Sequence, residues 1–338
     1  MFTTEFRTTL VKYLKGPTSL VPIFVIGETG IGKTMISLDT AKHLGFSTVI
    51  LQIGTKTIEY FTGIPTTDEK LKRAIWTMPD LVRLVEEAPQ PVMLLIDDAH
   101  LAQEETVKVL WEMLSSRTLH NYPFPPETKL VFAANPYTEE FGSTVSNMPK
   151  PIRSRVHIIT MENDVQTWLG LSYQRKIHPF VTGFVSSHKQ HFMSEPDAEG
   201  MYCSPRGWWN LSNYLDNGFE LTSELVKGFS GSQAAEEFVV FHNTYLKFID
   251  NTPVWQELKT EAEKAAFITY LLINDDMTEI KRVVTSAAMS GVSDVDTVFL
   301  TVLIKMVKSA RGDKAAADLM SDVTPEDIQK IVSLQGGM

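Results

Sequence analysis

Short apolar runs alternate, along the first half of the chain, with longer segments whose apolar residues recur every three or four positions. Short runs bounded by turn residues are typical of buried strands, and the longer spacing is typical of amphipathic helices. The alternation predicts an α/β fold, a parallel sheet between two helical layers. The predicted strands are residues 20–26, 47–53, 91–97, 129–135 and 155–161.

Segments of helical periodicity separate most of these runs. The predicted helices in this half are residues 1–15, 33–44, 68–88 and 102–117. Gly16 and Pro17 end the first of them, and Pro79 interrupts the third. After Asn163 the strand pattern fades, and the remaining sequence reads as helices.

The segment VIGETGIGKTM, residues 25–35, joins the first predicted strand to a helix. Its spacing of Gly27, Gly32, Lys33 and Thr34 fits the P-loop pattern in full. Glycines let main-chain N–H groups converge on an anion, and the helix start adds the positive end of its dipole. Lys33 would reach the β- and γ-phosphates of ATP, and the Thr34 hydroxyl would bind Mg²⁺. The predicted phosphate-binding residues are Gly27, Glu28, Thr29, Gly30, Ile31, Gly32, Lys33 and Thr34.

Two carboxylates, Asp97 and Asp98, end the apolar strand VMLLID. A carboxylate at the carboxyl end of such a strand can hold the Mg²⁺ shell, which is the Walker-B role, and we assign it to Asp97. Asp98 would then polarise the attacking water. The alternative is an Asp pair that caps the following helix.

Asn135 ends the strand KLVFAAN. If that strand lies between the P-loop strand and the Walker-B strand, its amide would stand near the γ-phosphate and could orient water. Asn-Pro is also a common turn, so this role depends on the strand order.

Arginines precede the fifth strand and open a later helix. Arg153 and Arg155 suit a finger that stabilises charge on a neighbouring subunit's γ-phosphate, or are two surface arginines. Arg206 could reach back to the nucleotide and couple it to the second domain. Stacking of Arg206 on Trp208 or Trp209 is the alternative.

Together these elements resemble the AAA+ superfamily, and most closely its MoxR-like branch. The segments that carry the likeness, besides the P-loop, are EYFTGIP at 59–65, LWEMLSSRTLHNYPFPPETKLVFAANP at 110–136, SPRGW at 204–208 and VKGFSGSQAAEEFVVF at 226–241. The resemblance, which runs from about 20 to 245, implies a homo-hexameric ring. It also implies Mg-ATP held between subunits and the remodelling of a protein client, as a chaperone does.

Carried onto the matching positions, the resemblance implies that Asn135 is sensor 1, Arg155 the finger and Arg206 sensor 2. One position departs from the family, which usually has Glu where this chain has Asp98. Asp is one methylene shorter, and a carboxylate misplaced by about 1 Å can lose on the order of a hundredfold in rate. We therefore expect slow basal hydrolysis.

The resemblance also bears on the domain organisation. We expect an AAA+ nucleotide-binding domain over 1–162, a helical lid over 163–249 and a helical C-terminal extension over 250–338. Within the extension, Thr324 and Pro325 predict the start of a helix over 324–335. The extension either packs onto the lid or offers a docking surface.

Aromatic side chains after the second strand allow two interpretations. Tyr60 and Phe61 could belong to a pore loop that grips a client, but core or interface packing is the commoner fate of aromatics. The insertion at 119–127 is expected to form an exposed hairpin, because its prolines disfavour a central strand.

Composition narrows the class of partners. The chain has 338 residues and a net charge of −10, which argues against a generally basic nucleic-acid binder but leaves a local basic pore open. Cys203 is the only cysteine, so no intrachain disulfide can form, and a small buried side chain is the simplest reading. No signal-peptide core or membrane-spanning run is present, so a cytoplasmic location is expected, the host's if the gene is a phage gene.

These observations favour a ring-forming Mg-ATP hydrolase that remodels a protein client. MoxR-like members often act with a von Willebrand factor A-type or metallopeptidase-like partner, which the resemblance alone implies. Three alternatives remain open: a small-molecule or nucleic-acid 5′-kinase, a nucleic-acid-dependent ATPase or loader, and an ATP-gated scaffold with little hydrolysis. Arg155 and Arg206 argue against the kinase.

Overall fold

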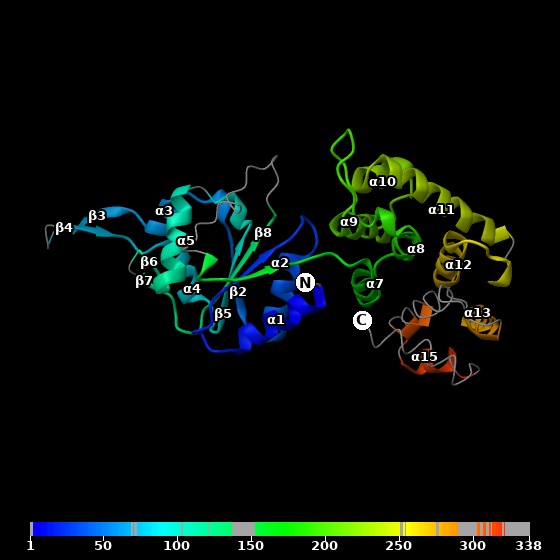
Figure 1. Ribbon diagram of the computed structural model, residues 1–338, viewed down its shortest axis with the longest axis horizontal. Coiled ribbons are helices and arrows are strands. Elements are labelled where there is room, and N and C mark those ends of the chain that lie inside the picture. Colours follow the sequence, from blue (N-terminus) through cyan, green and yellow to red (C-terminus); the bar gives the residue numbers. More distant parts are fainter. Residues whose placement is uncertain are drawn as a thin grey trace. The chain divides into compact units, whose positions relative to one another are not determined.

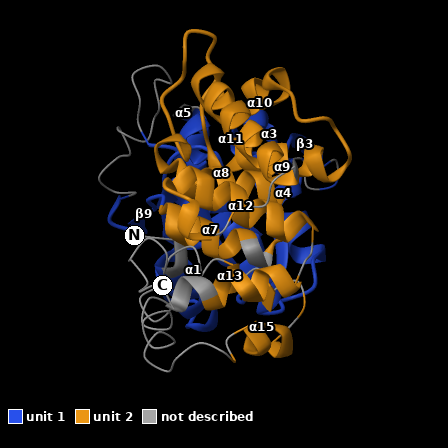
Figure 2. Cartoon of the chain, turned by 90° about the vertical axis from the view of Figure 1, so that its right-hand side faces the viewer, with its two compact units in different colours: residues 1–163 blue, residues 164–338 orange. Residues whose placement is uncertain are grey.

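A computed structural model of the chain divides into two compact units, residues 1–163 and 164–338 (Figures 1 and 2). The structure describes residues 3–136, apart from 69, 71, 72, 103 and 121, and then residues 153–250. In the rest of the chain it describes residues 253, 255–274, 277–289, 303–304, 307–308, 311, 313–319 and 321. The helix predicted over 324–335 lies outside the described residues.

The first unit is built on a parallel sheet. Among the described residues, five strands pair in the order β2–β5–β8–β1–β9, all in the same direction. The strands are β1 Ile23–Ile26, β2 Ser47–Gln52, β5 Val92–Asp97, β8 Lys129–Ala134 and β9 His157–Thr160. Strand β8 therefore lies between β1 and β5, and the carboxyl ends of all three meet at one edge of the sheet.

Helices cover both faces of this sheet, as alternation along β5 shows. Val92, Leu94 and Ile96 join one apolar cluster with side chains of α4 and α5. Met93 and Leu95 are equally buried and point to the opposite face, the side of α1 and α2. These helices are α1 Thr3–Lys15, α2 Lys33–His43, α4 Asp80–Glu87 and α5 Glu104–Ser116. The expected three-layer α/β fold is confirmed.

Hydrogen bonds join the N-terminal helix α1 and the turn after it to β8, the central strand of the sheet. The Tyr13 hydroxyl donates to Leu130 O at 2.9 Å, and burial raises the pKa of this phenol to about 12. Lys129, which is 3% exposed, donates from Nζ to Gly16 O at 2.7 Å and to Pro17 O at 2.9 Å. The turn that ends α1 therefore holds the first residues of strand β8.

The helix predicted over 68–88 is wrong in its first half. Two antiparallel strands form there instead, with β3 Pro65–Asp68 paired to β4 Arg73–Trp76. Gly63 turns the chain into this hairpin from the short helix α3 Glu59–Thr62. Its φ of 74° suits glycine, and a Cβ there would lie 2.1 Å from Thr77 O. Helix α4 begins only at Asp80, just after Pro79.

A second, smaller hairpin lies where the insertion was expected to form one. Strands β6 Thr118–Leu119 and β7 Tyr122–Pro123 pair antiparallel. Pro123 is exposed, but Leu119 and Phe124 are buried in the sheet's apolar cluster. The Trp76 and His120 rings meet edge to face at 4.5 Å, so the two hairpins contact each other.

The described part of the second unit is helical. Its elements are α7 Val165–Gln174, α8 Pro179–Ser187, η4 Lys189–His191, α9 Pro205–Asp216, α10 Ser223–Ser230, α11 Ser232–Asp250, η5 Trp255–Glu257, α12 Glu261–Asn274, α13 Met277–Met289 and α15 Asp313–Leu319. None of the helices in the described residues is long and apolar enough to cross a membrane.

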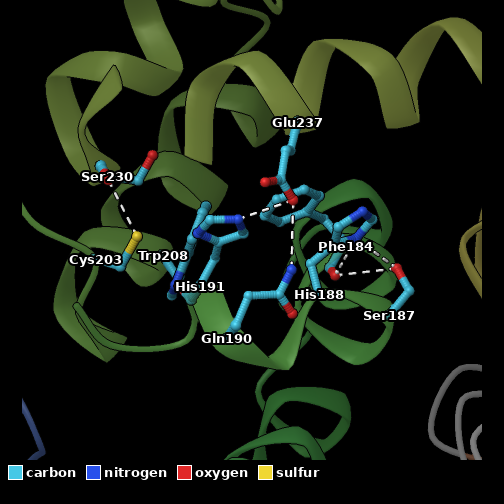
Figure 3. Close-up of polar contacts among 9 residues, drawn as sticks. All are labelled: Phe184, Ser187, His188, Gln190, His191, Cys203, Trp208, Ser230 and Glu237. Carbon is cyan, nitrogen blue, oxygen red and sulfur yellow. Dashed lines mark hydrogen bonds and ion pairs between the residues drawn. The ribbon is translucent and has the colours of Figure 1, made fainter. Parts of the chain in front are cut away.

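An aromatic cluster lies in the core of this unit, and Figure 3 shows the polar contacts beside two of its rings, Phe184 and Trp208. Trp208 is fully buried beside Phe184, and its Nε1 donates to His191 O at 3.1 Å. His191 Nε2 lies 2.9 Å from Glu237 Oε2 on α11. Cys203 is 1% exposed, and burial raises the pKa of its thiol to about 11, so the expected buried side chain is confirmed.

Candidate functional site

The loop between β1 and α2 has the backbone that anion binding requires. Gly30 and Gly32 take left-handed φ values of 80° and 98°, which glycine adopts at no steric cost. Gly32 is also the N-cap of α2, and it offers no side chain to the first helical N–H groups. The first turn of α2 contains no acidic residue that would repel an anion. The loop and the helix start therefore form a site that fits phosphate.

Packing fixes the beginning of this loop. Gly27 N donates to Ala134 O at 3.1 Å, which fastens the loop to the end of β8. A Cβ at Gly27 would lie 2.7 Å from Met161 O, the residue after β9. Only glycine fits there, so the chain can leave β1 close to both neighbouring strands.

Lys33 lies at the centre of the site, although its side chain is 7% exposed. Its Nζ donates to Gly27 O at 2.6 Å, to Glu28 O at 2.9 Å and to Asn135 Oδ1 at 2.9 Å. Three oxygen acceptors compensate the burial of the charge. The ammonium group thus joins the loop to the end of β8.

Thr34 and Asp97 form the second contact across the site. Thr34 Oγ1 donates to Asp97 Oδ2 at 2.8 Å, and Asp97 Oδ1 accepts from Asp98 N at 3.1 Å. A hydroxyl and a carboxylate are the hard oxygen donors that Mg²⁺ prefers, and Mg²⁺ commonly takes its other ligands from water and phosphate. No cluster of three His, Cys, Asp or Glu side chains that could hold a metal occurs among the described residues. The residues present therefore fit Mg²⁺ bound together with a nucleotide.

Asp98 follows in a left-handed conformation, with φ of 51° and ψ of 41°. It is the N-cap of the short helix η2 Ala99–Leu101, but its side chain makes no capping hydrogen bond there. The Asp98 side chain therefore does not cap the following helix, which was the alternative to a catalytic role. Its carboxylate is half-buried, directly after the Asp97 carboxylate.

His100 is a site residue that sequence reasoning did not identify. It lies in η2, is 6% exposed, and contacts Asn135 twice. Its Nδ1 lies 3.3 Å from Asn135 N, and its Nε2 lies 3.3 Å from Asn135 Nδ2. The available signal was the histidine in the run DDAH, three positions after Asp97.

Asn135 therefore has partners on both sides. Its side-chain oxygen accepts from Lys33, and its two nitrogens face His100. It occupies the position that the sequence argument required, at the end of the strand between β1 and β5.

The structure does not bring Arg155 into this group. Arg155 is half-buried in the turn before β9, whereas the site lies beyond the strands' carboxyl ends. Because His157 pairs with Ile23, that turn lies at the opposite edge of the sheet, one strand length or about 13 Å away. Arg153 nearby is exposed.

Arg206 belongs to the second unit. It is exposed on the first turn of α9, which Ser204 caps by accepting from Gly207 N at 3.1 Å. The tryptophans proposed as its stacking partners have other contacts. Trp208 is fully buried, and the Arg175 guanidinium lies over the Trp209 ring, with Cζ 5.8 Å from the ring centroid.

The aromatic pair after β2 serves packing in part. Phe61 is fully buried in the apolar cluster of the sheet, which favours the core interpretation for this residue. Tyr60 is half-buried, and its ring meets the Phe61 ring edge to face with centroids 5.4 Å apart. Lys56 Nζ lies 4.7 Å from the centroid of the Tyr60 ring.

A family match agrees with this geometry. Residues 22–165 match the family described as the AAA domain of the dynein-related subfamily. No curated protein matches the chain. The solved structures similar to it include a point mutant of RuvB from Thermotoga maritima, at 16% identity and a TM-score of 0.40, covering 88% of this chain and 84% of that one. NtrX from Brucella abortus is similar at 15% identity and a TM-score of 0.42. The match covers 89% of this chain and 67% of NtrX.

Proposed function

We propose that this chain, whose residues 22–165 form an AAA+ domain, is a Mg-dependent ATP hydrolase that assembles into a ring and remodels a protein client. The observation that carries the proposal is a set of short contacts between three strand ends. Lys33 reaches Asn135 at 2.9 Å, and Thr34 reaches Asp97 at 2.8 Å. A lysine, a hydroxyl, a carboxylate and an amide thus converge on one phosphate-binding loop.

Each residue of the site has a distinct task in the proposed reaction. The N–H groups of the loop and of the α2 start bind the phosphates, and Lys33 neutralises charge on them. Thr34 and Asp97 would hold Mg²⁺, which would stabilise the negative charge that develops on the phosphate during the reaction. Asn135 and Asp98 orient the attacking water.

Asp98 sets the expected speed of this reaction. Its carboxylate is one methylene shorter than the glutamate usual in AAA+ proteins, and its left-handed backbone fixes where the short side chain starts. Hydrolysis is therefore slow in the isolated chain, and a partner that shifts η2 would raise it.

A ring is supported by the place of Arg155. An arginine about one strand length from its own subunit's site cannot contact the nucleotide held there, but it can serve the site of the next subunit. Within each subunit, Arg206 and the lid over 163–249 would respond to the nucleotide, and residues 250–338 would form an extension. The MoxR-like chaperone role and a von Willebrand factor A-type or metallopeptidase-like partner are carried by the sequence resemblance.

The proposal is tested by steady-state release of phosphate from Mg-ATP. We expect slow turnover that disappears in Lys33→Ala, with Lys42→Ala as the matched control on the exposed end of the same helix. A purified chain that binds ATP but releases phosphate no faster than Lys33→Ala would contradict hydrolysis. It would favour the second candidate, an ATP-gated scaffold, for which the short Asp98 side chain is the supporting observation. Turnover that rises only with added DNA or RNA would favour the nucleic-acid-dependent ATPase.

A further inference from the structure

His100 and Asn135 face each other through nitrogen atoms only. The His100 ring presents Nδ1 to the main-chain N–H of Asn135 and Nε2 to the side-chain amide, each at 3.3 Å. A single buried ring thus meets both nitrogens of a residue that also contacts Lys33. This pairing calls for a function beyond filling the core.

The orientation of the Asn135 amide follows from its other partner. An ammonium group can only donate, so the group that faces Lys33 Nζ at 2.9 Å is the amide oxygen. The amide NH₂ must then face His100. Both Asn135 groups that meet the imidazole are donors, and His100 must supply the acceptor.

Only a neutral imidazole can do this. Neutral imidazole has one nitrogen lone pair and one N–H, so each tautomer accepts from one of the two Asn135 donors and turns its N–H toward the other. The tautomer with its proton on Nδ1 has the lone pair on Nε2, where it accepts from the amide NH₂. Imidazolium has no acceptor and would oppose both. A charged His100 would attract the amide oxygen instead, and the turned amide would present its NH₂ to Lys33, donor against donor.

We propose that neutral His100, with its lone pair on Nε2, is a positioning residue that keeps the oxygen of the Asn135 side chain directed toward Lys33 and the phosphate site. The proposal rests on the proposed function in one respect, namely that Asn135 orients the attacking water. An amide oxygen accepts a hydrogen from water and leaves the water's lone pair free for attack, whereas an NH₂ group would bind that lone pair.

The surroundings of His100 support the neutral form. Burial is the main cause that lowers its pKa below the ordinary value. Among the described charged groups, Asp98 and Asp97 raise the pKa of the ring and Lys33 lowers it. The neighbouring helix η1, Ile53–Thr55, contributes no titratable side chain. The lowered pKa favours the neutral ring that the Asn135 donors require.

Two substitutions separate positioning from simple packing. His100→Gln keeps an acceptor oxygen near the place of Nε2 but cannot become a cation. His100→Leu fills similar space without any acceptor. His43→Gln is the control, because His43 is exposed at the end of α2.

The experiment measures kcat for ATP from pH 5 to 8 and the Kd for ADP in the wild type and the three variants. We expect His100→Leu to lose about tenfold or more in kcat, as a misplaced water-orienting group does, with the Kd for ADP within about twofold. His100→Gln keeps most of the kcat at pH 7 and lacks the fall in kcat that His100 protonation gives the wild type in acid. His43→Gln behaves as the wild type does.

A kcat for His100→Leu equal to that of the wild type would overturn the proposal. The proposal would also be overturned if kcat of His100→Gln fell in acid as much as that of the wild type. This second comparison decides the question even if the leucine variant does not fold.

A second readout needs no turnover and so separates this proposal from the proposed function. Nitrogen-15 spectra of the histidine rings should show His100 neutral at pH 7, with ring shifts that change in Asn135→Leu while those of His43 do not. An imidazolium His100 at pH 7 would refute the positioning role even in an active enzyme. A neutral ring coupled to Asn135 in a chain without hydrolysis would support the contact and refute only the ATPase.

Discussion

Thr34 and Asp97 are 63 positions apart in the chain, yet the threonine hydroxyl donates to the aspartate carboxylate at 2.8 Å. The contact joins the first turn of α2 to the carboxyl end of β5. The contact holds side by side a hydroxyl and a carboxylate, two hard oxygen donors of the kind that Mg²⁺ prefers.

The charge of Asp97 should therefore matter more than its shape. Asp97→Asn keeps the size of the side chain and an oxygen that can accept from Thr34, but removes the negative charge. We expect phosphate release to fall by about a hundredfold or more, because the metal is held less tightly and transition-state charge is less stabilised. Asp80→Asn is the control, since Asp80 forms an exposed ion pair with Arg83 that contributes little. Equal rates in Asp97→Asn and the wild type would place the metal elsewhere.

Lengthening Asp98 should accelerate the reaction. Asp98→Glu moves the carboxylate toward the position that AAA+ glutamates occupy, and we expect kcat to rise by about tenfold or more. Asp98→Asn should lower kcat below the wild-type rate. If Asp98→Glu leaves turnover unchanged or lowers it, the length of this side chain is not what limits hydrolysis.

Arg155 should act on the nucleotide of another subunit. We expect Arg155→Ala and Lys33→Ala each to be inactive alone and to regain activity when mixed, because an interface can then combine an intact Lys33 with an intact Arg155. Arg153→Ala, at the exposed neighbouring position, is the control and should stay active. No recovery on mixing would argue against a finger in trans.

The same reasoning predicts a change in particle mass. The chain should reach about six subunits with a slowly hydrolysed ATP analogue, in closed cyclic symmetry. A monomer without nucleotide, with ADP and with the analogue would contradict the ring.

Replacing Gly207 should destabilise the second unit for steric reasons. A Cβ on this residue of α9 would lie 2.3 Å from Phe229 O on α10. Gly207→Ala should therefore lower the free energy of unfolding by about 1–3 kcal/mol, the usual range for overpacking. Gly228→Ala on α10 is the control: a Cβ there meets nothing within 4 Å, so stability should hold or rise by up to about 1 kcal/mol. Thermal midpoints of the two variants test this difference.

The second unit should lose stability in acid. Burial lowers the pKa values of His178, His188 and His242, even where a carboxylate opposes it. The unfolded chain then binds more protons below about pH 6.5, the ordinary histidine pKa. The stabilising contribution is complete above that pH and is lost as the pH falls through the lowered folded values.

The thermal midpoint measured from pH 8 to 5 should show this loss. His188→Phe should flatten the dependence of the midpoint on pH, because it removes one titrating ring. The new aromatic ring can still stack on Phe184, whose centroid lies 4.4 Å from that of His188. His43→Phe, at an exposed position, should leave the slope unchanged. A midpoint constant down to pH 5 would contradict neutral burial of these rings.

The sheet and the P-loop could be predicted from sequence because both depend on local signals. Buried strands of a parallel sheet are continuous apolar runs, and the loop has a fixed spacing of glycines and lysine. Strand order decided the role of Asn135, and that order is a property of tertiary pairing. It could be stated only as a condition on the sequence, and the observed place of β8 meets it.

The β3–β4 hairpin could not be predicted in this way. All four residues of β4 are exposed, so the strand has no buried face and shows no alternation of apolar and polar residues. In the sequence, Leu71, Ala74, Ile75 and Met78 have helical spacing instead. The hairpin depends on Gly63 and on Thr77 Oγ1, which accepts from Ile64 N at 2.8 Å. His100 was missed for a related reason, because its meaning lies in a contact across 35 positions.

The bonds between α1 and β8 mean that the folding unit is larger than the matched family region. A fragment beginning at residue 22 would lack Phe6 and Leu10, both fully buried, and would uncover the part of α2 that α1 packs against. It would also leave the Lys129 ammonium without two of its hydrogen-bond acceptors, the carbonyl oxygens of Gly16 and Pro17. Any excision of this domain for separate study should therefore keep the N-terminal helix, or the protein will be prone to aggregate.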